Sequence, residues 1–298
     1  MMKKYIFFLL ASFLYTACED VVNIGLHDTD LDSYIIQANI TTIDEPTVYF
    51  GKPLPITTDT LYNGISNAII TITDDATPPN VVTLNENTEY NGFYYVPDNE
   101  DYFGVVNRSY TINVLTSEGV NISATETLYP VEPIDSIEIR PSLRGAKLFL
   151  GIFTYGQETP GLGNYYKWDI YINDTALSSN QNLMFVDDAL VDGNYVPGLE
   201  VFTDFHDPQN EEERLLKYLD TVYVKQLSIS ESTYDYYYFM INQMSSGSMF
   251  SVPPANLPTN FTADDGKSVN GIFIANDVSI SNSVVIDSLI ENSLRKFQ

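Results

Sequence analysis

The chain has 298 residues and a formal net charge of −26, with 40 acidic and 14 basic side chains. A surface this acidic repels nucleic-acid phosphates and anionic lipid headgroups, so we expect no nucleic-acid partner. The single cysteine excludes an internal disulfide, and burial of apolar surface alone has to stabilise the fold.

Two lysines near the N-terminus precede an apolar run over residues 6–14, too short for a transmembrane helix of about 20 residues. The following Tyr15-Thr16-Ala17-Cys18 resembles a lipobox, where the lipoprotein signal peptidase cuts before a cysteine that carries diacylglycerol. The first of these residues is tyrosine where leucine is usual. We predict a lipoprotein signal peptide over residues 1–17 and a lipid on Cys18. An ordinary signal peptide followed by a chance cysteine is the alternative.

An acidic pair, Glu19 and Asp20, follows the cysteine directly and resembles the surface-export signal of Bacteroidota lipoproteins. We therefore expect the protein at the outer membrane, facing the cell exterior, with a periplasmic orientation left open. Residues 18–33 are polar and acidic with little periodicity. That composition predicts a tether between the membrane and the folded part.

Residues 34–130 show one strand pattern after another. Residues 68–73 alternate with period two and are rich in β-branched side chains, which is typical of a half-buried strand. The alternation returns over residues 110–124, where Ser117-Glu118-Gly119 interrupts it and predicts a hairpin, and Asn91-Gly92 marks a second turn. About seven short strands in this length predict an immunoglobulin-like or transthyretin-like β-sandwich domain.

A second domain is predicted over residues 135–298, after a boundary marked by Pro130 and Pro133. Its strand patterns lie at 146–155, 165–172, 199–205, 221–229, 271–280 and 283–286. A tyrosine-rich pattern with spacings of three and four predicts one helix near residues 231–246. Residues 210–217, with acids at their start, predict one or two further helical turns. The predicted fold class is therefore mainly β, a β-sandwich followed by a mostly-β domain with one helix.

Catalytic motifs are missing from the sequence. The two histidines are His27, in the tether, and His206, after a strand, and no serine stands in a G-x-S-x-G turn. A zinc site normally needs several His or Cys ligands, which this chain does not supply. Carboxylate pairs occur at Asp74-Asp75, Asp187-Asp188 and Asp264-Asp265, but solvated turns explain them better than a glycosidase-like cleft. We expect no enzyme, and a carboxylate-dependent hydrolase is the least favoured alternative.

Asp187, Asp188 and Asp192, just before Gly193, form the densest acidic loop in the second domain. Calcium takes oxygen ligands from such loops, although this spacing does not match an EF-hand. We name these three residues as a candidate calcium site and expect no other cofactor. A solvated acidic loop that binds no ion is the favoured alternative.

Aromatic residues are abundant, with 22 Tyr and 16 Phe, but Trp168 is the one tryptophan. Trp168 together with Tyr165 or Tyr166 could stack against a sugar ring at a glycan site. The strand alternation places Trp168 and Tyr166 on one face, which favours burial of the indole.

Several soft motifs follow one another in a characteristic order. The strand pattern ending at Leu128 leads into Pro130-Val131-Glu132-Pro133, a Tyr-rich helix carries Gln243, and a proline-rich stretch over 250–260 precedes Gly271-Ile272-Phe273. This order resembles a Bacteroidota outer-membrane lipoprotein family known as domain of unknown function 4249. The resemblance would cover nearly all of the mature chain, but residues 264–268 depart from an expected glycine-rich stretch. It implies an outer-membrane lipoprotein often encoded near a TonB-dependent transporter, and no catalytic residue.

These expectations combine into one functional hypothesis. The chain is expected to be a non-enzymatic accessory or binding lipoprotein at the cell surface, partnering a TonB-dependent outer-membrane transporter. A surface glycan-binding protein or adhesin is the alternative. The sequence identifies neither the ligand nor the oligomeric state.

Overall fold

The computed structural model describes residues 32–55, 60, 63–177, 183–206, 212–244 and 257–295. Residues 32–298 belong to one compact unit. The predicted signal peptide, Cys18, the Glu19-Asp20 pair, His27 and the tether as far as residue 31 lie outside the described residues. The described part is mainly β, which confirms the predicted fold class. None of its helices is long and apolar enough to cross a membrane.

Seven strands span residues 34–128, as the alternation predicted. They are β1 (Tyr34–Thr41), β2 (Thr47–Gly51), β3 (Ile69–Asp74), β4 (Val81–Glu86), β5 (Phe93–Tyr95), β6 (Arg108–Leu115) and β7 (Asn121–Leu128). The predicted hairpin joins β6 to β7 through Gly119, and Gly92 makes the turn before β5; both glycines have positive φ. The inward side chains of these seven strands form one core, because every second residue faces the same side of a strand.

Two later strands complete this first sheet. β15 (Thr262–Ala263) pairs with β7, and β16 (Val269–Asn276) pairs in parallel with β1, so the strand order is β15-β7-β6-β3-β4-β5-β2-β1-β16. Phe261 and Phe273 are buried in the first core. We assigned these residues to the second domain from the sequence. Periodicity shows that a segment forms a strand, but it does not show which sheet the strand joins.

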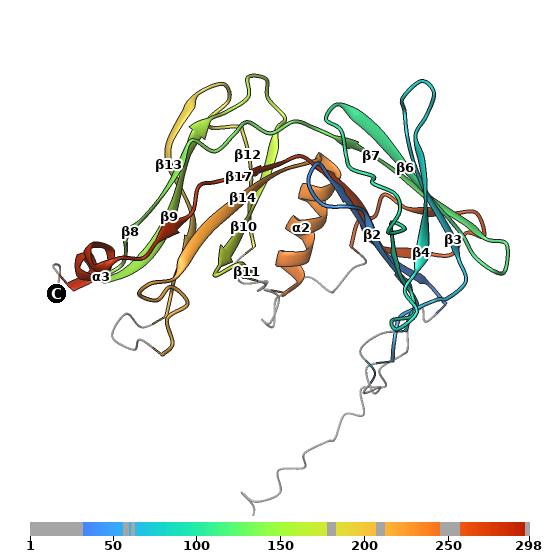
Figure 1. Ribbon diagram of the computed structural model, residues 1–298, viewed down its shortest axis with the longest axis horizontal. Coiled ribbons are helices and arrows are strands. Elements are labelled where there is room, and N and C mark those ends of the chain that lie inside the picture. The colour runs from blue at the N-terminus through green and yellow to red at the C-terminus, as the bar shows by residue number, and fades with distance from the viewer. Residues whose placement is uncertain are drawn as a thin grey trace, which may run out of the picture. The chain divides into compact units, whose positions relative to one another are not determined.

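The second core lies between two further sheets. In Figure 1, β8 (Ser136–Arg144), β9 (Lys147–Gln157) and β13 (Tyr195–Thr203) lie side by side as a three-stranded sheet. The other sheet contains β10 (Tyr165–Ile172), β11 (Thr175–Ala176), β12 (Met184–Asp187), β14 (Thr221–Ile229), β17 (Val278–Ile280) and β18 (Val284–Val285). Ile139 and Ile152 of the three-stranded sheet share a buried cluster with Trp168 and Val224 of the other sheet.

Two helices lie in the described residues. α2 (Glu231–Met244) confirms the predicted helix, and the Ser230 hydroxyl caps it by accepting a hydrogen bond from Thr233 N at 3.2 Å. α3 (Ser288–Arg295) was missed by the sequence reading, although the Asp287 carboxylate caps its first turn. Eight residues are too few for periodicity alone to reveal a helix.

The helical turns predicted within residues 210–217 are wrong for the part that the structure describes, residues 212–217. Leu215 N and Leu216 N both donate to the Asp204 carboxylate, each at 2.9 Å. Those amides are therefore bound to a side chain from another segment instead of to carbonyls one helical turn earlier.

Asp277 connects the first sheet to the sheet of β10 and β14, at the point where β16 continues into β17. Its carboxylate accepts Thr42 Oγ1 at 2.8 Å and Val131 N at 2.9 Å. Its own N–H donates to Ser228 Oγ of β14 at 2.9 Å, and that hydroxyl donates to the Tyr129 carbonyl. Chain segments next to β1, β7 and β14 thus converge on one aspartate.

The β1–β16 pairing leads to a stability prediction at Gly271. Its φ is +119°, and a Cβ added there would lie 1.9 Å from the Ile36 carbonyl oxygen. Gly119 also has a positive φ, +87°, but a Cβ there would meet nothing within 4 Å. We expect Gly119→Ala to lower the free energy of unfolding by about 1 kcal/mol, from backbone strain alone. Gly271→Ala should cost about 2 kcal/mol more, because it also forces the two strands apart.

Chemical denaturation of both variants measures the difference directly. Equal losses at the two glycines would show that β16 does not pack against β1 as described.

Candidate functional site

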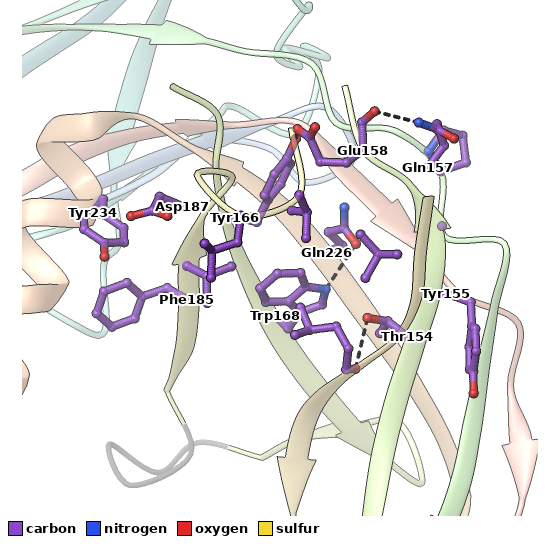
Figure 2. Close-up of a pocket in the computed structure, with 17 residues that line it drawn as sticks. Thr154, Tyr155, Gln157, Glu158, Tyr166, Trp168, Phe185, Asp187, Gln226 and Tyr234 are labelled. Carbon is purple, nitrogen blue, oxygen red and sulfur yellow. Dashed lines mark hydrogen bonds between the residues drawn. The ribbon is translucent and has the colours of Figure 1, made fainter. Parts of the chain in front are cut away.

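A pocket of about 340 Å³ lies between the three-stranded sheet and the sheet of β10, β12 and β14 (Figure 2). Most of its wall is apolar or aromatic, and Val186, Val191, Val196 and Leu199 contribute to it. The pocket is an unfilled extension of the second core, because β9, β10, β13 and β14, which surround the pocket, bury their apolar residues in that core.

The sequence of β9 explains why the space is unfilled. Leu150 and Ile152 point into the core, and the period of two places Thr154 and Gly156 on the same face. The inward side chains therefore shrink from Leu and Ile to Thr and then to Gly along the strand. The pocket is bordered by Thr154 and Gly156, where the inward side chains of β9 are smallest.

Trp168 of β10 forms part of the pocket wall but is only 4% exposed. Its indole Nε1 donates to Gln226 Oε1 of β14 at 3.1 Å, which holds the ring in place (Figure 2). The predicted burial of this tryptophan is confirmed. Trp168 therefore presents no open aromatic face at the surface for a sugar to stack on.

Tyr166, two residues earlier on the same face, connects the pocket to an acidic group. Its hydroxyl donates to Glu158 Oε1 at 2.8 Å. Burial raises the pKa of the Tyr166 phenol, and the neighbouring Glu158 carboxylate raises that pKa further. The phenol therefore remains a hydrogen-bond donor at neutral pH.

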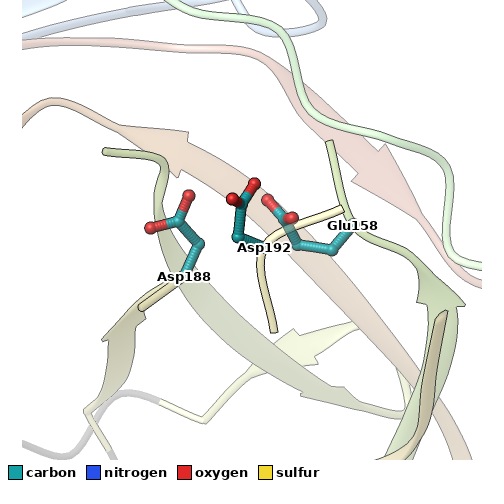
Figure 3. Close-up of side chains that lie close together, drawn as sticks. All are labelled: Glu158, Asp188 and Asp192. Atoms are coloured by element: carbon teal, nitrogen blue, oxygen red, sulfur yellow. The ribbon is translucent and has the colours of Figure 1, made fainter. Parts of the chain in front are cut away.

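Three carboxylates gather where β9 ends, from Glu158, Asp188 and Asp192 (Figure 3). One oxygen of each lies within 4.8 Å of the others. Glu158 is 5% exposed and Asp188 is 2% exposed, whereas Asp192 is half-buried. None of the three forms an ion pair with a described Lys, Arg or His.

Backbone amides account for the positions of these carboxylates. Both oxygens of Asp188 accept main-chain N–H groups, from Gly163 and Asn164, each at 3.1 Å. Asp192 Oδ1 accepts Gly161 N at 2.6 Å, and Gly193 N donates to Glu158. The cluster therefore joins the loop after β9 to the loop after β12.

The structure changes the residue set of the predicted calcium site. Asp188 and Asp192 come together, but Asp187 is exposed, accepts a bond from Ala189 N and lies beside Tyr234 (Figure 2). Adjacent residues on a strand point to opposite faces, which separates Asp187 from Asp188. Glu158, about 30 residues earlier, was missed. The sequence does carry a signal for Glu158: it lies two residues after Gly156, so the period of two places it in phase with the inward face of β9. Calcium binding itself stays a prediction.

The other polar residues considered from the sequence lie elsewhere. His206 lies in a surface loop as predicted, with its Nδ1 at 3.0 Å from Asp204 Oδ1. Asp264 and Asp265 are exposed as expected. The prediction that the carboxylate pairs lie in solvated turns is wrong for Asp74 and Asp188, because both side chains are buried. Burial would raise the pKa of Asp74, but hydrogen bonds from Asn80, Ala76 and Arg108 hold it below the usual value.

The neighbouring residues Asp188 and Asp187 offer a matched comparison. We expect Asp188→Ala to lower the free energy of unfolding by about 2 kcal/mol, because two backbone amides lose a charged acceptor. Asp187→Ala should change it by less than about 0.5 kcal/mol, since that side chain is exposed. Denaturant titration of both variants tests this; similar losses would mean that Asp188 does not hold the loop.

The family model of DUF4249, a domain of unknown function, matches residues 19–281. The match includes the pocket, the three carboxylates and the strands that position them. No curated protein sequence matches the chain. Because the family model covers most of the sequence, the chain belongs to the DUF4249 family.

Proposed function

We propose that this chain is a non-enzymatic binding lipoprotein that is anchored in the outer membrane through Cys18, faces the cell exterior and acts with a TonB-dependent transporter. In this proposal the pocket between β9 and β10 holds a small molecule. The pocket is the observation that carries the proposal.

Its dimensions and lining suit that role. Small-molecule sites are typically clefts of about 300–1,000 Å³ with apolar walls and a few well-placed polar groups. The pocket, at about 340 Å³, lies at the small end of that range. Val191, Val196 and Leu199 provide apolar surface, while Gln226 and Glu158 provide polar groups. Apolar burial would supply affinity, and the polar groups would orient the ligand.

The carboxylates beside the pocket favour binding over catalysis. Hydrolysis by a carboxylate pair needs two acids that face each other across a cleft and reach the substrate. Here Asp188 uses both oxygens on main-chain amides, and Glu158 accepts from Tyr166 and Gly193. Groups bound in this way position loops, and their hydrogen bonds would have to break before they acted on a substrate.

The cell-surface address rests on the sequence before the described residues. The apolar run, the lipobox-like segment ending at Cys18 and the acidic pair Glu19-Asp20 follow one another in the order that a surface-exported lipoprotein needs. The transporter partnership rests on the resemblance to Bacteroidota outer-membrane lipoproteins.

Glycan binding is the second candidate, and the stacked pair of Tyr171 and Tyr223 is the aromatic surface that it would use. Tyr171 and Tyr223 stack with ring centroids 4.7 Å apart and an interplanar angle of 8°. The Lys225 ammonium lies 5.0 Å from the Tyr171 ring centroid. The two rings therefore cover one face of each other and a lysine lies over part of the pair, which leaves less aromatic surface for a sugar.

A pull-down from gently solubilised native membranes, with a tag at the C-terminus, tests the partnership. We expect a TonB-dependent outer-membrane transporter in stoichiometric amount by mass spectrometry. A Cys18→Ser variant is the control, because it removes the predicted lipid and separates direct binding from shared residence in the membrane. A chain that elutes alone would contradict the accessory role and favour a free-standing glycan binder.

Two variants separate anchoring from surface display. Cys18→Ser should abolish incorporation of labelled fatty acid and release the protein from membranes. Replacement of both Glu19 and Asp20 by alanine should leave the lipid in place but protect the protein from protease added to intact cells. Protease sensitivity unchanged by the double substitution would show that the acidic pair is not an export signal.

A further inference from the structure

The charged groups that line the pocket are all of one sign. Glu158 and Asp187 line it, and none of the Lys, Arg or His residues in the described part of the chain does. Lys167, the basic residue of β10, lies on the opposite face of the strand from Tyr166 and Trp168 and forms an ion pair with Asp169. An anionic ligand would therefore meet carboxylates without any compensating cation.

The buried carboxylates also lack a cation of their own. Glu158 and Asp188 are almost fully buried, Asp192 lies against them, and no described basic side chain neutralises the group. Burial of an unpaired charge is costly, and hydrogen bonds offset only part of that cost. A cation placed beside Glu158 would therefore gain from the negative charge gathered there.

The surroundings favour an organic cation over a metal ion. Calcium needs six to eight oxygen ligands, whereas this cluster brings together one oxygen from each of three carboxylates. Most of the pocket that Glu158 lines is apolar, and Val191, Val196 and Leu199 offer no oxygen ligands from their side chains. An apolar body joined to a positively charged group matches both parts of the site.

We propose that the pocket binds an apolar amine in its protonated form, with the apolar body against Val191, Val196 and Leu199 and the ammonium beside Glu158. This inference rests on the proposed ligand-binding function of the same pocket. The negative charge of Glu158 and its neighbouring carboxylates selects a cation, and the apolar walls select the apolar body.

Trp168 makes the test direct, because it is the one tryptophan of the chain and lines the pocket. The test uses the chain from residue 19 onward, which contains the whole compact unit and needs no detergent that would occupy the pocket. The probes are phenylbutylamine, phenylbutanol and phenylbutyrate, which share one apolar body and differ in charge. We expect the amine to bind about tenfold more tightly than the alcohol, and the carboxylate most weakly, by tryptophan fluorescence and calorimetry.

Variants assign the selectivity to the carboxylates. Glu158→Gln keeps one oxygen for the Tyr166 hydroxyl but loses the acceptor of Gly193 N, and it should remove most of the tenfold preference while phenylbutanol binds as before. Asp187→Asn, at an exposed position of the pocket lining, should reduce the preference less and disturbs no buried bond. The control is Asp174→Asn, the same charge change in the exposed turn after β10, which should leave all affinities unchanged.

Occupation of the pocket is tested separately. Val196→Phe fills the pocket and should weaken the amine and the alcohol alike by about tenfold, whereas Val105→Phe, on an exposed loop before β6, should not. Melting temperatures show whether each variant is folded. If Glu158→Gln does not fold, Asp187→Asn carries the charge test.

The outcomes separate the two proposals. Equal binding of amine and alcohol, both weakened by Val196→Phe, would overturn the amine inference and leave the pocket as a ligand site. Calcium binding that depends on Glu158, without a preference for the amine, would overturn it in favour of a metal. Failure of all three probes to bind at millimolar concentration would overturn both the inference and the proposed ligand-binding role of the pocket.

Discussion

The β1–β16 pairing is the contact on which the rest of the described structure depends. A chain without disulfides has to close its sheets by burial and backbone pairing, and β16 does this for the first sheet while β17, directly after it, joins β14 in another. Asp277 lies between these two strands and accepts hydrogen bonds from Thr42 and Val131. A single C-terminal segment therefore takes part in both cores, which makes the first sheet dependent on residues far away in the sequence.

The pocket follows from the way the second core ends. Along the inward face of β9 the side chains become smaller toward Gly156, while Trp168 on the facing sheet is held by Gln226 and does not move into the space. Packing there is incomplete, although protein interiors are normally dense. Asp188 and Asp192 hold the loops beside the pocket through main-chain amides. Glu158 lines the pocket and belongs to the same group of carboxylates, so it brings negative charge to the pocket wall.

Sequence reasoning succeeded where one short-range signal decided the structure. Period-two alternation located β10 and β14 with the bounds that the structure has, and spacings of three and four located α2. It failed where a contact from a distant segment decided the outcome. Residues 212–217 are not helical because Asp204 binds the amides of Leu215 and Leu216, and the buried carboxylate of Asp74 is paired with Arg108. In the candidate site, the acidic loop after β12 was recognised, but Glu158 was not, because its partners follow it by about 30 residues.

The sequence by itself determined the mainly-β class, the order of most strands, the position of α2 and the burial of Trp168, since local alternation and side-chain size act over a few residues. It also carries the predicted lipid signal at Cys18. Only the tertiary structure decided that β16 belongs to the first sheet, that a pocket opens between β9 and β10, and that Glu158 joins Asp188 and Asp192. These features arise from pairing and packing between segments far apart in the chain, and each depends on the volume and hydrogen-bonding groups that the opposite segment presents.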